Sequence, residues 1–126
     1  MVGCPGSGKS HFARNYLKHY GYVNRDTLGS WQKCITIMEK HINEKDSVVI
    51  DNTNPDCVSR QRYIEIAKKY NIPVRCFVML TSIDHAKHNN KVIVQFGMIK
   101  RNLQYRCKYY TKYFISVSGI NRSYSR

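Results

Sequence analysis

Residues 3–10 read Gly3-Cys4-Pro5-Gly6-Ser7-Gly8-Lys9-Ser10 and match the GxxxxGK[ST] pattern of a phosphate-binding loop in full. Glycines recur in such a loop because its backbone amides enclose a phosphate where side chains would clash. Met1-Val2 predicts the end of a strand before the loop, and the residues after it predict a helix. We therefore expect all eight residues to hold ATP, with Lys9 on the β- and γ-phosphates and the Ser10 hydroxyl on Mg²⁺. A generic glycine-rich turn is the alternative.

In the first ninety residues, short apolar runs typical of buried strands alternate with segments that have helical periodicity. Such alternation implies right-handed crossovers and an α/β fold in which helices flank a parallel sheet. The predicted strands are Met1-Val2, Tyr22-Val23, 47–50 and 74–80, and the predicted helices are 9–20, one capped by Ser30, 58–70 and one opened by Thr81-Ser82.

Polar residues follow the predicted strands at the points where they end. These segments are the loop at 3–10, Asn24-Arg25-Asp26, the run 51–54 and Thr81-Ser82. Because the carboxyl ends of parallel strands meet at one edge of the sheet, where ligands bind, we expect the polar chemistry to gather there.

Five side chains near this edge are candidates for phosphoryl transfer. Asp51 ends an apolar strand, where phosphate-loop proteins place a carboxylate near the metal, although a strand-end aspartate is also common. The adjacent pair Arg25-Asp26 supplies a cation for an anionic acceptor and a base for its hydroxyl, or it is an exposed charge pair. Arg60 and Arg62 lie near the start of a predicted helix, where the helix dipole disfavours a positive charge. Contact with phosphate and a solvated helix face explain the two arginines equally well.

The length of 126 residues allows one domain, and the formal net charge of +13 favours a polyanionic partner. No apolar run approaches the roughly 20 residues that cross a bilayer, and the N-terminus does not resemble a secretory signal. We therefore expect no membrane contact, and we expect a monomer. The five cysteines form no CxxC pair, which indicates free thiols in a reducing compartment.

Residues 91–126 differ in composition from the rest of the chain. They contain 8 basic and no acidic residues and five of the ten tyrosines, whereas residues 1–90 contain 13 basic and 8 acidic residues. We place a boundary at Lys91, between an incomplete kinase-like domain at 1–90 and a basic, tyrosine-rich tail without a predicted domain. The tail either binds single-stranded nucleic acid through cations and rings or is a replacement end from splicing or a frameshift.

Three runs carry a resemblance to a known family. GYVNRDTLGSWQ at 21–32, VVIDNTNPDCVSRQRY at 48–63 and VRCFVMLTSIDHAKHNN at 74–90 resemble the C-terminal 5′-kinase domain of the polynucleotide kinase 3′-phosphatase family. The resemblance implies a nuclear enzyme of DNA strand-break repair that phosphorylates 5′-hydroxyl DNA ends with ATP and Mg²⁺. It implies that Asp26 is the general base, that Lys9 and Ser10 contact ATP and Mg²⁺, and that Asp51 organises the metal and acceptor side. Arg25 and one of Arg60 and Arg62 would grip DNA phosphates.

The sequence also departs from the family. Only two residues precede the loop, so the sheet is expected to be truncated at its first strand and to lack the family's last strand. No phosphatase motif is present, and Lys91 stands where the family begins a lid with a catalytic arginine. Such an arginine contributes about 10³-fold or more in rate, so we expect impaired turnover. A non-catalytic nucleotide- or DNA-binding remnant is the alternative, and a small-metabolite kinase is less favoured by the charge.

Overall fold

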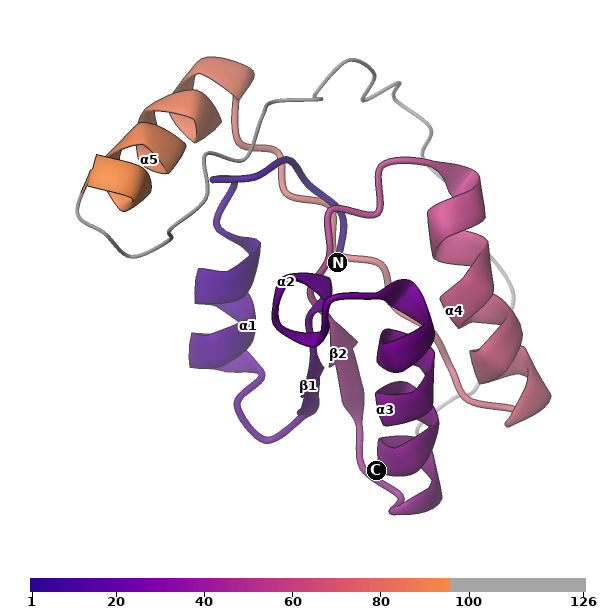
Figure 1. Cartoon of the computed structure of the whole chain (residues 1–126). Helices are drawn as coiled ribbons and strands as arrows, with labels where there is room; N and C mark the ends of the chain where they lie inside the picture. The colour runs from indigo at the N-terminus through magenta and orange to yellow at the C-terminus, as the bar shows by residue number, and fades with distance from the viewer. Residues whose placement is uncertain (96–126) are drawn as a thin grey trace, which may run out of the picture.

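The computed structural model describes residues 1–95 and contains a small parallel sheet flanked by helices (Figure 1). Strand β1 (Gly21–Val23) pairs in parallel with β2 (Val48–Ile50), and Tyr22 lies opposite Val49 in the register. The prediction of a mixed α/β structure with parallel strands is therefore confirmed for this part of the chain.

The helices of the described residues include the four predicted ones in their predicted order and one short helix, Arg25–Leu28, that was not predicted. They are α1 (Lys9–Tyr16), α2 (Arg25–Leu28), α3 (Trp31–Asn43), α4 (Cys57–Lys69) and α5 (Ile83–Gln95). Side-chain caps fix several of their starts: Ser30 accepts from the Lys33 amide at 3.3 Å, and Asp56 accepts from the Ser59 amide at 2.6 Å. These caps satisfy backbone donors that a helix start leaves without partners.

Both faces of the sheet are covered, which explains why the strands are apolar without alternation. On one face, Tyr22 and Val49 pack with α1 around Ala13. On the other, Val23 packs in a cluster with residues of α3 and α4. Figure 1 shows α1 on one side of the strands and α3 and α4 on the other.

The segment before the phosphate-binding loop lies between β2 and residues 77–79. The Met1 amine donates to the Ile50 carbonyl at 2.8 Å, and Val2 exchanges backbone hydrogen bonds with Phe77 and Met79. The predicted strand at 74–80 is wrong in extent, because only Val78 forms a bridge, with Val2. The pairing stops there because the next residue, Gly3, turns toward Thr53 and donates to its carbonyl at 3.3 Å.

One other predicted boundary needs correction. The first helix ends at Tyr16, not near Tyr20, because residues 17–20 turn into β1 with the Tyr20 amide bonded to the Leu17 carbonyl. The segment after β1 continues as the short helix α2, which Asn24 caps through the Thr27 amide.

The predicted boundary at Lys91 stays a prediction, and residues 96–126 of the predicted tail at 91–126 lie outside the described residues. Among residues 1–95, no helix has the length and apolar character to cross a membrane.

Candidate functional site

The phosphate loop, residues 3–10, closes directly before α1 and turns inward on its own lysine. The Lys9 side chain is buried, and its Nζ donates to the carbonyls of Gly3 at 2.8 Å and Cys4 at 2.9 Å. Gly8 precedes the helix with a left-handed backbone, so the first amides of α1 lie beside the loop. A helix start carries partial positive charge, which favours an anion at this place.

Helix α5 and the residue Thr81 hold the outer side of the phosphate loop. The Asn89 side chain donates to the Gly6 carbonyl at 3.1 Å, and the Thr81 hydroxyl donates to the Ser7 carbonyl at 2.9 Å. Ala86 is fully buried, and its carbonyl lies so close to Gly6 that an added Cβ would come nearer than 3.0 Å. Sequence reasoning did not find Asn89, because its contact joins residues 83 positions apart.

Asp51 is a buried carboxylate with one oxygen bound and the other without a partner. The Tyr22 hydroxyl donates to Oδ2, and the Asn24 side chain donates to the Asp51 carbonyl at 2.7 Å. Asp51 is 1% exposed, and its Oδ1 is buried without a hydrogen bond among the described residues. Since a buried polar atom without a partner is costly, this oxygen suits a donor or cation supplied by a ligand.

The environment of Tyr22 shifts the pKa of its hydroxyl. Burial raises this pKa above its usual value, and the hydrogen bond and charge of Asp51 raise it further. Ser10 and Arg14 act in the opposite direction and lower the same pKa. The phenol therefore remains protonated and able to donate to Asp51.

Hydrogen bonds join the segment that begins α2 to the segment that follows β2. The Arg25 amide donates to the Asn52 side chain at 2.7 Å, and Asn52 in turn donates to the Tyr63 hydroxyl at 3.0 Å. Asp26 lies exposed on α2, beyond the carboxyl end of β1 (Figure 1). Within residues 1–95 it forms no ion pair. The polar segments thus meet at one edge, as the strand order predicts.

A shallow pocket at this edge contains two of the three candidate arginines. The Arg62 guanidinium lies 4.5 Å from the centre of the Trp31 ring, a distance typical of a cation–π contact. The pocket is lined by Arg25, Trp31, residues 52–55, Ser59, Arg62 and Tyr63. Arg60 does not line it, because its guanidinium donates to the Asn54 carbonyl at 2.9 Å and to Cys57 Sγ at 3.3 Å. Trp31 was not among the predicted site residues, and the structure places it beside Arg62 in this pocket.

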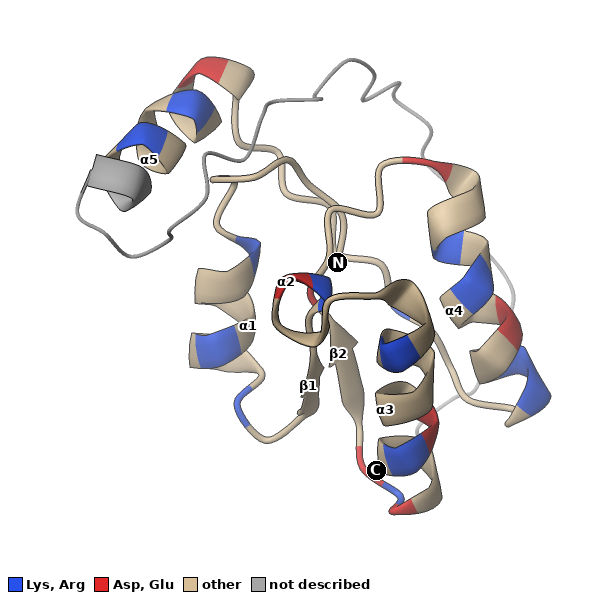
Figure 2. Ribbon diagram, viewed as in Figure 1, with Lys and Arg blue, Asp and Glu red and all other residues tan. Residues whose placement is uncertain are grey.

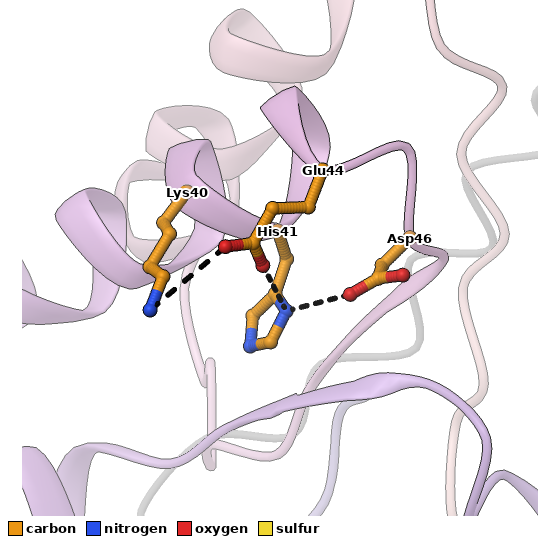
Figure 3. Close-up of polar contacts among 4 residues, drawn as sticks. All are labelled: Lys40, His41, Glu44 and Asp46. Carbon is orange, nitrogen blue, oxygen red and sulfur yellow. Dashed lines mark hydrogen bonds and ion pairs between the residues drawn. The ribbon is translucent and has the colours of Figure 1, made fainter.

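Figure 2 shows basic residues on each labelled helix, and acidic residues as well on α2, α3, α4 and α5. At the end of α3, Glu44 and Asp46 both approach His41 Nδ1, at 3.7 and 3.1 Å (Figure 3). This group lies beside the first residue of β1, because a Cβ on Gly21 would meet the His41 ring. The group of His41, Glu44 and Asp46 lies at the end of the sheet opposite the phosphate loop, and its contacts join residues 44–46 to α3.

The described residues thus form a small parallel α/β unit with a glycine-rich loop before its first helix and with carboxylate and amide side chains at the strand ends. No family model matches the chain. It is 41% identical over 120 residues to the "Putative bifunctional polynucleotide phosphatase/kinase" of Acanthamoeba polyphaga mimivirus, across 91% of this chain and 28% of the relative. It is 44% identical over 92 residues to the bifunctional polynucleotide phosphatase/kinase of Schizosaccharomyces pombe, across 71% of this chain and 22% of the relative.

These similarities confirm the resemblance: the chain matches a segment of the polynucleotide kinase family. It spans about a quarter of the length of these curated relatives, at 28% and 22%. The similarity to the viral relative covers 91% of the chain and so extends past residue 90.

Proposed function

We propose that the chain carries the 5′-hydroxyl kinase chemistry of a polynucleotide kinase, which transfers a phosphoryl group from ATP to a DNA end. The observation that carries this proposal is the contact of the phosphate loop with the segment after β2, through the Gly3 amide and the Thr53 carbonyl, next to the buried Asp51 and a pocket that contains two arginines. The relatives are named as polynucleotide phosphatases/kinases, which supports a nucleic-acid substrate. A role in DNA repair would place the protein in the nucleus.

The residues of the phosphate loop fit a bound nucleotide. Gly6 leaves no room for a side chain, so the backbone itself forms the wall, and the Lys9 amine faces loop carbonyls that phosphate oxygens can replace. Ser10 and the free oxygen of Asp51 are hard oxygen ligands that suit Mg²⁺. When bound, Mg²⁺-ATP supplies the phosphoryl group and the cation that neutralises its charge.

The acceptor side is formed by α2 and α4. Asp26 is exposed on α2, so it is open to a DNA 5′-hydroxyl and takes its proton as the general base. Arg25 and Arg62 line the neighbouring pocket and hold phosphates of the same strand. Trp31 adds an aromatic surface beside them, as single-strand binding requires. Arg60 does not line this pocket, and its guanidinium is bonded to the Asn54 carbonyl, so we assign the DNA contact to Arg62.

Turnover is proposed to be weak. Lys91 lies within α5, where the family resemblance leads us to expect a lid arginine soon afterwards. A lysine is a point charge without the paired donors of a guanidinium, so it stabilises the transferring phosphoryl group less. A chain that binds Mg²⁺-ATP and DNA without transfer is the second candidate function, favoured by this lysine.

The test is phosphate transfer from γ-labelled ATP to a 5′-hydroxyl oligonucleotide. We expect slow transfer by the wild-type chain and none by Asp26→Asn, with nucleotide binding retained, whereas Asp46→Asn at the opposite end of the sheet leaves transfer unchanged. Transfer that survives Asp26→Asn would contradict the assignment of the base. Binding of both ligands without transfer would establish the second candidate.

The DNA contact is tested by paired variants of the neighbouring arginines. Arg62→Ala should weaken oligonucleotide binding and reduce its dependence on salt, because a phosphate contact releases a counterion. Arg60→Ala should bind with nearly the wild-type affinity, because its guanidinium is engaged by Asn54. Equal losses in the two variants would refute the assignment to Arg62.

A further inference from the structure

Tyr22 contacts Asp51, one of the two residues proposed to hold the metal, and neither the relatives' names nor the sequence motifs assign it a role. It is the central residue of β1, and its side chain is on the face covered by α1. Its hydroxyl donates to Asp51 Oδ2. Because strand pairing fixes Tyr22 opposite Val49, the phenol reaches Asp51 from a rigid position in the sheet.

The direction of this hydrogen bond determines which oxygen of Asp51 is free. The Tyr22 hydroxyl donates to Oδ2, so Oδ2 is engaged. Asp51 Oδ1 is buried and without a partner among the described residues.

We propose that Tyr22 is a positioning residue that orients Asp51 as an oxygen ligand for a divalent cation, which Ser10 would hold as well. The inference rests on the proposed function, since the cation is the one that accompanies the nucleotide. A carboxylate can present either oxygen, and the Tyr22 hydroxyl selects which oxygen stays free. Partners that orient metal ligands in this way typically contribute 10–100-fold in metal affinity.

The test compares Tyr22→Phe with Tyr16→Phe, which removes the same hydroxyl from an exposed ring on α1. Binding of a non-hydrolysable ATP analogue is measured with Mg²⁺ and again with a chelator. In Tyr22→Phe we expect the Mg²⁺-dependent gain in affinity to fall by about 10–100-fold, with binding in chelator unchanged. Tyr16→Phe should retain the wild-type gain. A merely structural role would weaken binding equally in both conditions.

Two further measurements keep the inference open to refutation. In an Asp51→Asn background, Tyr22→Phe should cause no additional loss, because the hydroxyl acts through Asp51. If Tyr22→Phe fails to fold, the ultraviolet difference spectrum of the wild-type chain serves instead. Adding Mg²⁺ to the complex with inorganic triphosphate should perturb a tyrosine band, and an unchanged spectrum would overturn the inference.

The outcomes separate this inference from the proposed function. A wild-type chain that shows Mg²⁺-dependent binding, lost in Tyr22→Phe, but no transfer to DNA would support the role of Tyr22 and refute the kinase activity. An undiminished Mg²⁺-dependent gain in Tyr22→Phe, alongside transfer by the wild type, would refute only the role of Tyr22. A wild-type chain without any Mg²⁺-dependent gain would overturn both.

Discussion

Substituting Gly6 by alanine tests how closely α5 packs on the phosphate loop. Gly6 has a φ of +77°, and a Cβ at this position would lie closer than 3.0 Å to the Ala86 carbonyl of α5. Gly29 is a matched control, because its φ is +82° and a Cβ there has nothing within 4 Å. Both variants strain the backbone, but only Gly6→Ala creates a clash.

The expected magnitudes follow from these two differences. The left-handed backbone costs a residue with a Cβ about 1–2 kcal/mol, which is the whole effect expected in Gly29→Ala. In Gly6→Ala, the loop or α5 must also shift, which weakens the hydrogen bonds from Asn89 and Thr81 to the loop. Each hydrogen bond contributes about 1 kcal/mol, so Gly6→Ala should lose about 2 kcal/mol more than the control.

Thermal unfolding of the two variants measures this difference. In a domain of this size about 1 kcal/mol shifts the midpoint by roughly 4–8 °C, so the two midpoints should differ by about 10 °C. Gly6→Ala should also lose nucleotide binding, which Gly29→Ala retains. If both variants unfold at the same temperature, α5 does not support the loop as the structure indicates.

Three further predictions concern the segment from Asn52 to Tyr63. Asp56→Ala should destabilise the fold by about 1 kcal/mol at neutral pH, measured by denaturant unfolding, because it removes the cap of α4. The Ser59 amide holds the pKa of Asp56 below its usual value, so this contribution is present above about pH 4 and is lost as the pH falls further. Burial raises the pKa of Tyr63 to about 12, so Tyr63→Phe should remove the tyrosine absorbance change near that pH. Because the unfolded chain ionises this phenol from about pH 10, the contribution of Tyr63 to folding stability is lost as the pH rises from about 10 to 12. Arg60→Ala should cost about 1 kcal/mol in unfolding free energy, because the Asn54 carbonyl loses its donor.

Local signals account for the elements that the sequence predicted well. Ser30 caps α3 as expected, because a cap depends on residues three positions apart. The strand 48–50 and the start of α4 follow from a short apolar run and a polar loop. The predicted strand at 74–80 did not form at full length, since strand pairing depends on a partner that its own sequence does not reveal.

The gathering of polar segments at one edge was predictable because it follows from parallel strand order alone. Which side chains touch within that edge was not. Arg60 and Arg62 are equivalent candidates in the sequence, yet the Asn54 carbonyl engages one and the Trp31 ring the other. The contact between Tyr22 and Asp51 joins residues 29 positions apart and depends on the register of two strands.

The buried carboxylate supports our proposal that this edge of the sheet binds a ligand. A buried carboxylate oxygen without a donor costs free energy, so packing for stability alone does not favour it. Tyr22 and Asn24 both donate to Asp51 Oδ2, the latter at 3.4 Å, whereas Oδ1 has no donor among the described residues. We propose that Oδ1 is kept for a bound cation, which would recover this free energy on binding.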